Sequence, residues 1–204
     1  MTLPKPIKFK VERYIGGLSQ FKKIDNPIKL SANESALGPS PKAIQAFEND
    51  KNNIFKYPES DSESLREALS EKFNINPKRI ICGAGSDQIF DLTCRLFLKP
   101  KDEVIVTEFG FIMHRIYASL HNAKIVLAKE KNFTASVEEI LKKVTNKTKI
   151  VFIANPNNPT GTYVSKSEML NLRKKLRSDI LLVVDDAYFE FLNSSDFTSG
   201  LDLF

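Results

Sequence analysis

Two short polar segments carry side chains that can do chemistry, and each directly follows an apolar run. The segments are residues 155–161 (Asn-Pro-Asn-Asn-Pro-Thr-Gly) and residues 185–188 (Asp-Asp-Ala-Tyr). Each apolar run is typical of a buried strand, so both segments would lie at strand carboxyl ends, where open α/β sheets bind ligands. Asn158, Asp185 and Tyr188 supply an amide, an anion and a phenol. This set suits a heteroaromatic ring that carries a basic nitrogen and a phenolic oxygen.

Pyridoxal phosphate is a ring of this kind. A carboxylate against its pyridine nitrogen would keep that nitrogen protonated, which lets the ring accept electrons from a carbanion. Asp185 is the candidate for this contact, and Asn158 and Tyr188 are the candidates for the phenolic oxygen. Stabilising that oxygen as an anion would tune the protonation of an adjacent imine. Asp185 alone would equally suit a helix cap, so the prediction depends on the three side chains together.

A glycine turn and an aromatic residue extend this hypothesis. Gly85, Ser86 and Asp87 lie between a predicted strand and a predicted helix. Free N–H groups and the positive end of the helix dipole meet there, which suits a phosphate, although a plain turn with Ser86 as N-cap fits the same residues. Phe111 begins a helix after a predicted strand. It could pack in the core or lie flat over a cofactor ring.

The rest of the chain predicts the elements that position these residues. Apolar runs predict strands at 79–82, 104–107, 124–128, 149–154 and 180–184. Helical spacing predicts helices at 42–47 and 112–120, one after Gly85, and three after the capping sequences 60–63, 136–139 and 165–168. Strands mostly separated by amphipathic helices indicate an α/β fold of three layers, α/β/α, with a mainly parallel sheet. Residues 1–30 are irregular and basic, and we expect them to form an N-terminal arm.

Composition narrows the classes of protein. A hydrophobic content of 42% and a charged content of 27% are ordinary for a globular domain of 204 residues. The net charge of +5 comes from scattered lysines, so no nucleic-acid partner is predicted. Cys82 and Cys94 suit reduced thiols of a cytoplasmic protein, and His114 and His121 are interpreted as ordinary helix residues with no metal site. No apolar run is long enough to predict a membrane span.

These residues together resemble the fold-type I pyridoxal-phosphate aminotransferase family, most closely its histidinol-phosphate members. Seven blocks carry the resemblance in family order: LSANES at 30–35, GPSP at 38–41, YP at 57–58, CGAGSD at 82–87, EFGF at 108–111, NPNNPTG at 155–161 and DDAY at 185–188. The family usually has glutamate at the position of Asp186, and many members have tyrosine at the position of Phe111. The resemblance implies that residues 31–204 are the N-terminal part of the cofactor-binding large domain.

The resemblance implies roles for nine residues. Six would contact the cofactor: Ser86 and Asp87 at its phosphate, Phe111 on its ring, Asn158 and Tyr188 at its phenolic oxygen, and Asp185 at its ring nitrogen. Tyr57 would reach across a homodimer interface to the phosphate of the partner subunit. Tyr14 and Asn33 would lie near the substrate.

The implied reaction is amino transfer between histidinol phosphate, a small phosphorylated amino substrate, and 2-oxoglutarate. This would make the parent protein an enzyme of histidine biosynthesis. Two alternatives stay open. Threonine-phosphate decarboxylase shares these motifs and also takes a phosphorylated amino substrate. A non-catalytic half that needs a partner chain is the other.

The family's Schiff-base lysine follows the Asp185 strand, whereas the last lysine here is Lys175 and residues 189–204 contain none. No catalytic residue is therefore assigned, and we expect the chain by itself to be a catalytically incomplete fragment. The resemblance also implies that strand 180–184 and residues 81–84 lack the neighbours that the complete sheet supplies.

Overall fold

The computed structural model describes residue 11, residues 14–17 and residues 28–203. Most of the predicted arm at 1–30 therefore lies outside the described residues. The chain divides into two compact units, one of residues 14–82 and one of residues 83–204 together with 1–13. Each unit is described by itself.

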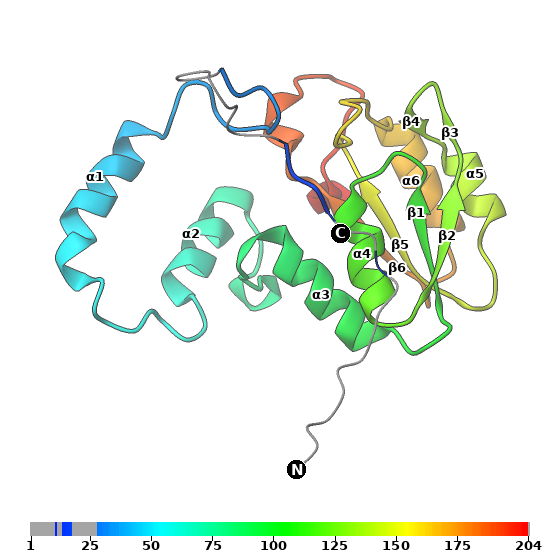
Figure 1. Cartoon of the computed structure of the whole chain (residues 1–204), viewed down its shortest axis with the longest axis horizontal. Helices are drawn as coiled ribbons and strands as arrows, with labels where there is room; N and C mark the ends of the chain where they lie inside the picture. The colour runs from blue at the N-terminus through cyan, green and yellow to red at the C-terminus, as the bar shows by residue number, and fades with distance from the viewer. Residues whose placement is uncertain (1–10, 12–13, 18–27, 204) are drawn as a thin grey trace, which may run out of the picture. The chain divides into compact units, whose positions relative to one another are not determined.

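The unit of residues 14–82 contains helices and loops. Its elements are α1 (Pro41–Asp50), η1 (Lys51–Asn53), α2 (Glu63–Phe73) and η2 (Pro77–Arg79) (Figure 1). Helices α1 and α2 confirm the predictions at 42–47 and after 60–63. The predicted capping sequence 60–63 does not cap α2, because the helix begins at Glu63. Its N-cap residue is Ser62, which has a left-handed backbone and makes no side-chain cap.

The predicted strand at 79–82 is also wrong. Arg79 ends the short helix η2, and Ile80 is extended but belongs to no ladder of the described residues. Ile81 is 77% exposed. An apolar run becomes a strand only where its N–H and C=O groups find a partner strand, and the run 80–82 finds none among the described residues.

The unit of residues 83–204 is built on a parallel sheet. Its four strands are β1 (Glu103–Thr107), β2 (Lys124–Ala128), β5 (Thr148–Ala154) and β6 (Leu181–Asp185), in the spatial order β2-β1-β5-β6. The helices are α3 (Gly85–Phe97), α4 (Ile112–Leu120), α5 (Val137–Lys142) and α6 (Lys166–Lys175). A small antiparallel hairpin, β3 (Glu130–Lys131) and β4 (Thr134–Ala135), and the short helices η3 (Phe189–Phe191) and η4 (Gly200–Leu203) complete it.

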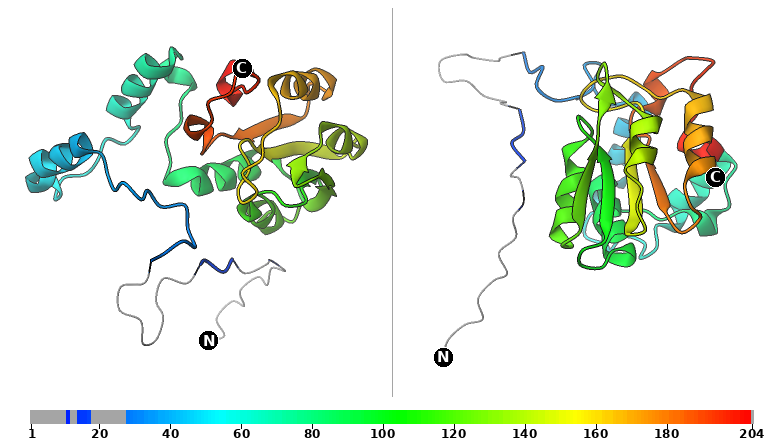
Figure 2. Two further views of the ribbon diagram at one scale, coloured as in Figure 1. Left: turned by 90° about the horizontal axis from the view of Figure 1, so that it is seen from above. Right: turned by 90° about the vertical axis from the view of Figure 1, so that its right-hand side faces the viewer.

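Helices cover both faces of the sheet, which confirms the predicted α/β/α layers (Figure 2). Alternate residues of each strand point to opposite faces. Val104, Val106, Ile150 and Phe152 pack with Phe90 and Cys94 of α3 and Ala118 of α4. The intervening residues pack on the other face with α5 and α6: Ile105, Val151, Ile153, Ile140, Met169 and Leu172. Burial raises the pKa of Cys94 to about 12, so this thiol is a packing group.

Two of the predicted capping sequences form as expected. The hydroxyl of Ser136 accepts from the N–H of Glu139, and the hydroxyl of Ser165 accepts from the N–H of Glu168. These contacts satisfy N–H groups that the first turn of a helix leaves open.

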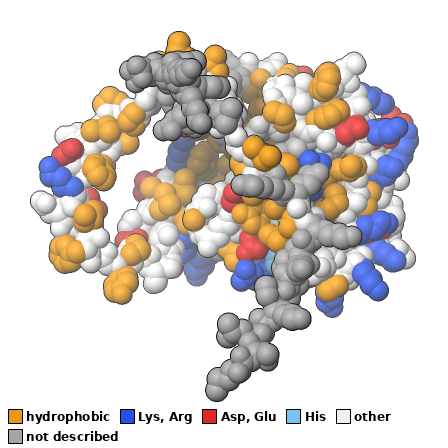
Figure 3. All heavy atoms as spheres, viewed as in Figure 1, with side chains coloured by type: hydrophobic (Ala, Val, Ile, Leu, Met, Phe, Trp, Pro, Cys, Tyr) orange, Lys and Arg blue, Asp and Glu red, His pale blue; other side chains and the backbone are white. Residues whose placement is uncertain are grey.

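The two edges of the sheet differ in chemistry. Strand β2 lies at the edge where Lys124 and Lys131 are exposed and form ion pairs, and Figure 3 shows basic side chains gathered over this side. Charged side chains of this kind discourage further pairing at an edge. Strand β6 forms the other edge, as predicted for residues 180–184. Within the described residues, no helix is long and apolar enough to cross a membrane.

Candidate functional site

A small pocket lies at the carboxyl ends of β5 and β6. It is lined by Ser86, Phe111, Ala154, Pro156, Asn158, Asp185, Ala187 and Tyr188. Five of the residues that the sequence predicted for one site therefore meet at one place: Ser86, Phe111, Asn158, Asp185 and Tyr188. The cavity measures about 80 Å³, well below the roughly 300 Å³ at which pockets for small molecules usually begin. These side chains therefore form one wall of a candidate site rather than a closed cavity.

The register between β5 and β6 brings the two polar segments side by side. Ala154 pairs with Asp185, and the N–H of Asn155 donates to the carbonyl of Asp185 at 3.0 Å. Parallel strands end at the same edge of a sheet, so the loops after them face one another. The pairing thus explains why Asn158 and Tyr188 line the same pocket.

The Asn-Pro loop uses its other two asparagines for its own structure. The buried amide of Asn155 accepts from the N–H of Val164 at 2.7 Å and donates to the carbonyl of Val164 at 3.3 Å. Asn157 donates from Nδ2 to Thr160 Oγ1 at 2.8 Å. Gly161 follows with φ +71, in the left-handed region that favours glycine. These contacts close the loop and leave Asn158 facing the pocket.

Asp185 is held by a histidine that the sequence analysis missed. Its Oδ2 lies 3.1 Å from Nε2 of His114, and its Oδ1 accepts from the N–H of Ala187 at 3.2 Å. His114 is 1% exposed, and its ring stacks on Phe152 with centroids 5.0 Å apart. His114 lies in α4, as interpreted from the sequence, but that interpretation left out its contact with Asp185. Its spacing of three from Phe111 was the available signal, because residues at i and i+3 share a helix face.

The second aspartate of the segment has a structural task. Asp186 Oδ2 accepts from the N–H of Gly200 at 2.6 Å and from the hydroxyl of Ser199 at 2.8 Å. Burial raises the pKa of Asp186, and the bonds to Ser199 and Gly200 oppose that shift. Asp186 thus ties the segment after η3 to the end of β6, whereas Asp185 faces the pocket.

Ser86 and Asp87 lie in the first turn of α3. Ala84 is the N-cap residue and Gly85 has φ +72, so the alternative in which Ser86 caps the helix is wrong. The first N–H groups of a helix have no intrahelical partner and carry the positive end of its dipole. Ser86 lines the pocket, whereas Asp87 is not among the residues of its wall. The predicted role of Asp87 therefore stays a prediction.

Phe111 is the N-cap residue of α4. Its ring meets Phe90 and His114 edge to face, with centroid distances of 6.4 and 5.7 Å. These two contacts fix the ring between the pocket and the core formed by α3 and α4. Phe111 thus packs against Phe90 and His114 and also lines the pocket. Its predicted place flat over a cofactor ring stays a prediction.

Three predicted site residues belong to the unit of residues 14–82. Tyr57 is fully exposed, and Tyr14 and Asn33 are exposed as well. Their predicted roles at a partner subunit and at a substrate stay predictions.

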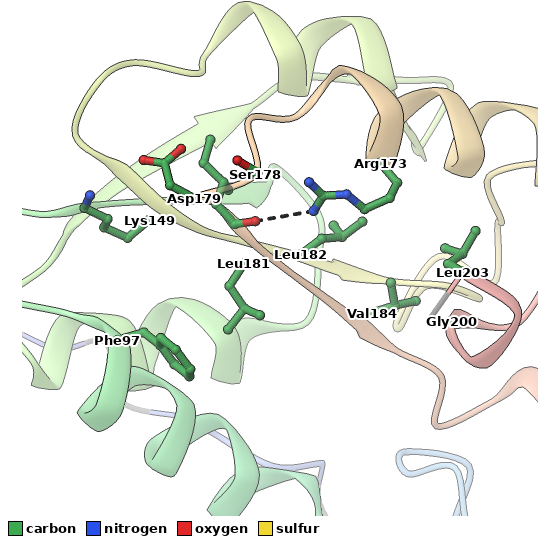
Figure 4. A pocket seen from close by; sticks show the side chains of 11 residues that line it. Phe97, Lys149, Arg173, Ser178, Asp179, Leu181, Leu182, Val184, Gly200 and Leu203 are labelled. Carbon is green, nitrogen blue, oxygen red and sulfur yellow. Dashed lines mark hydrogen bonds between the residues drawn. The ribbon is translucent and has the colours of Figure 1, made fainter. Parts of the chain in front are cut away.

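A larger hollow lies beside the open edge of β6 (Figure 4). It measures about 530 Å³, and its wall includes Phe97, Leu181, Val184 and Leu203. Arg173 donates to the carbonyl of Ile180 at 3.3 Å within it. None of the nine predicted site residues lines this hollow. Its place at a sheet edge distinguishes it from the smaller pocket, where the predicted site residues meet.

Comparison with known proteins identifies the class to which this fold and site belong. The sequence model of the family "Aminotransferase class I and II" matches residues 25–203. The chain belongs to this family.

Two curated relatives in sequence carry the same name. The chain is 58% identical over 204 residues to the histidinol-phosphate aminotransferase of Pelagibacter ubique, covering 100% of this chain and 57% of the relative. It is 44% identical over 200 residues to the histidinol-phosphate aminotransferase of Paramagnetospirillum magneticum, covering 98% of this chain and 55% of the relative. The chain thus spans about half the length of the curated relatives it matches.

Solved structures show the same likeness. A putative histidinol-phosphate aminotransferase from Erwinia carotovora atroseptica superposes with a TM-score of 0.81 at 25% identity, covering 87% of this chain and 52% of that one. The histidinol-phosphate aminotransferase from Sinorhizobium meliloti, solved in complex with pyridoxal-5'-phosphate, gives a TM-score of 0.75 at 26% identity, covering 78% and 44%.

Proposed function

We propose that this chain forms the pyridoxal-phosphate-binding part of a histidinol-phosphate aminotransferase. The whole protein would transfer an amino group between histidinol phosphate and 2-oxoglutarate in histidine biosynthesis, in the cytoplasm. The observation that carries the proposal is the pocket in which Ser86, Phe111, Asn158, Asp185 and Tyr188 meet. The names of the curated relatives support this reaction over the decarboxylase alternative.

The chemistry of the pocket wall fits the cofactor. A helix N-terminus at Ser86 suits a phosphate group, Phe111 offers an aromatic face, and Asp185 offers a carboxylate at the same pocket. When bound, pyridoxal phosphate supplies an electron-accepting ring whose nitrogen must stay protonated. The phosphate, the ring face and the ring nitrogen of this ligand thus each have a counterpart of suitable chemistry in the wall.

Asp185 would hold the proton on the ring nitrogen. Its Oδ2 contacts His114 Nε2 at 3.1 Å and its Oδ1 contacts the N–H of Ala187. These two contacts orient the carboxyl group toward the pocket. His114 would therefore act through Asp185 as a positioning residue.

Asn158 and Tyr188 would bind the phenolic oxygen from the two loops. An amide N–H and a phenolic O–H are both donors, and both side chains line the pocket. Two donors on this oxygen would favour its anionic form. Phe111 would lie against the ring and exclude water from that face.

The remaining parts of the site would come from outside this wall. We propose that Tyr57 binds the phosphate in the partner subunit of a homodimer, and that Tyr14 and Asn33 contact the substrate. We propose that Asp87 assists at the phosphate. The small volume of the cavity supports this view, because one wall alone encloses little of a cofactor of this size.

Titration of the purified chain with pyridoxal phosphate tests the proposal. We expect saturable binding, followed by the absorbance of the cofactor, with Asp185→Asn raising the dissociation constant about tenfold or more, the range expected for a hydrogen bond to a charged group. Asp179→Asn is the matched control, because Asp179 is exposed and pairs with Arg177 away from the pocket. Absence of binding, or equal affinity in Asp185→Asn, would contradict the proposal.

A further inference from the structure

The turn that leads into Phe111 is held from both sides by side chains of other elements. The N–H of Phe109 donates to Glu130 Oε1 at 3.1 Å, and its carbonyl accepts from Asn157 Nδ2 at 3.2 Å. Glu130 belongs to the β3–β4 hairpin and Asn157 to the Asn-Pro loop. Both backbone groups of one turn residue are thus satisfied by residues that lie 21 and 48 positions away in sequence.

The hairpin that carries Glu130 also contacts Thr162 and Phe109. Its tip residues Asn132 and Phe133 have φ angles of +51 and +60, which is uncommon for a bulky residue such as phenylalanine. The carbonyl of Phe133 accepts from Thr162 Oγ1 at 2.7 Å, and its ring lies 5.4 Å from that of Phe109. Positive φ at both central residues is the geometry that a two-residue hairpin loop of this kind requires.

The turn at Phe109 and Gly110 connects the Phe109 peptide to Phe111. Only Gly110 separates Phe109 from Phe111, and the N–H of Gly110 donates to the carbonyl of Thr107 at 3.2 Å. A Cβ at Gly110 would clash with Oγ1 of Thr107, so the turn is tight and has little room to adjust. The orientation of the Phe109 peptide therefore sets where α4 begins and where the Phe111 ring lies at the pocket.

The carboxyl group of Glu130 has one oxygen in an energetically unfavourable environment. Its Oε2 is buried and has no hydrogen-bond partner among the described residues, while Oε1 alone is used. A buried oxygen without a partner destabilises the fold, so hairpin stability alone gives no reason for a carboxylate here.

We propose that Glu130 is a positioning residue that holds Phe111 at the pocket by fixing the Phe109 peptide. The effect of this on cofactor binding rests on the proposed function; the mechanical link from Glu130 to Phe111 does not. Glu130 lies outside the pocket wall, so it acts only through the turn.

A single-tryptophan reporter tests the mechanical link. The sequence contains no tryptophan, so Phe111→Trp introduces a single tryptophan at the position of interest. In that background we expect Glu130→Ala to lower the fluorescence anisotropy, and Glu130→Gln, which keeps an acceptor for the Phe109 N–H, to restore it. Glu138→Ala is the matched control, because Glu138 is exposed and bonds to Lys131 of the same hairpin. Unchanged anisotropy in Glu130→Ala would overturn the proposal.

Hydrogen exchange provides a second test that keeps Phe111. It does not depend on whether the Phe111→Trp variant folds. We expect the peptide covering residues 108–112 to exchange faster in Glu130→Ala than in Glu138→Ala, with the core strands unchanged. Equal exchange over 108–112 would overturn the proposal.

Cofactor titration separates this inference from the proposed function. We expect Glu130→Ala to raise the dissociation constant of pyridoxal phosphate about three- to tenfold, the effect of one hydrogen bond. Unchanged affinity, beside a parent chain that binds, would contradict the inference and leave the proposed function standing. A parent chain that binds no pyridoxal phosphate would contradict the proposed function, and the anisotropy would then decide the positioning role.

Discussion

His114 Nε2 lies 3.1 Å from Asp185 Oδ2, and the two residues are 71 positions apart in the chain. The histidine comes from α4 and the aspartate ends β6, so the contact spans the layer between a helix and the sheet. Phe152 stacks on one face of the imidazole and Phe90 meets it edge to face at 4.7 Å. The imidazole is therefore fixed by packing, and it in turn fixes the carboxyl group that faces the pocket.

Replacement of this histidine should weaken cofactor binding without disrupting the core. His114→Phe keeps a ring between Phe90 and Phe152 but removes the bond to Asp185. We expect the dissociation constant of pyridoxal phosphate to rise about tenfold, the effect of one hydrogen bond to a charged group. His121→Phe is the control, since His121 contacts Asp91 instead, at 3.0 Å. Equal binding by His114→Phe and the parent would refute the positioning role.

Asp186 should make the chain less stable as the pH rises. Its pKa is raised above its ordinary value of 3.8 in the folded state, chiefly by burial. The folded state therefore binds more protons than the unfolded state between the two pKa values, so stability falls as pH rises through this window. Asp186→Asn stays neutral and keeps an acceptor for Gly200 and Ser199. We expect its melting temperature to exceed that of the parent above this window and to match it more closely below pH 4.

Asp196 provides a control for this pH dependence, because its pKa is shifted in the opposite direction. Bonds from Ser194 and Tyr163 lower the pKa of its exposed carboxyl group. Its contribution to stability is present above the ordinary pKa and is lost as pH falls through the lowered one. Asp196→Asn should therefore lower the melting temperature near neutral pH and approach the parent in acid. Parallel pH profiles for the two variants would show that neither carboxyl group behaves as described.

We expect a side chain at Gly110 to destabilise the fold unless Thr107 is replaced by a smaller residue. Its added Cβ would collide with Thr107 Oγ1, and overpacking of this kind destabilises by about 1–3 kcal/mol. We expect Gly110→Ala to lower the free energy of unfolding in urea by an amount in this range. The double variant Gly110→Ala with Thr107→Ala should destabilise by less than the sum of the two single changes. Strict additivity would place the conflict elsewhere.

We expect no single lysine of this chain to form a stoichiometric covalent bond with pyridoxal phosphate. Among the described residues, the wall of the small pocket contains no lysine. A lysine must reach the aldehyde to form a covalent bond with it. We expect borohydride reduction with pyridoxal phosphate, followed by peptide mapping, to yield scattered substoichiometric labels. A stoichiometric label on one lysine would contradict the described pocket wall.

Local patterns predicted the four strands of the parallel sheet and the end of the sheet at which the small pocket lies. The apolar runs at 104–107, 124–128, 149–154 and 180–184 each became strands, and the helix at 112–120 formed with the bounds expected. A strand repeats every two residues and a helix every 3.6, so both leave a signal in adjacent residues. The run at 79–82 had the same local signal but found no partner strand in the described residues, which shows where such patterns stop being sufficient.

The sequence by itself determined which side chains were available for the pocket and that Asn158, Asp185 and Tyr188 follow strands at one edge of a sheet. Only the tertiary structure decided that His114 supports Asp185, that Asp186 turns away to bind Gly200, and that Glu130 holds the turn before Phe111. These contacts join residues from separate elements, and their geometry depends on strand register and on how helices pack across a face. Strand register and helix packing leave no repeat in neighbouring residues, so no local pattern could have predicted these contacts.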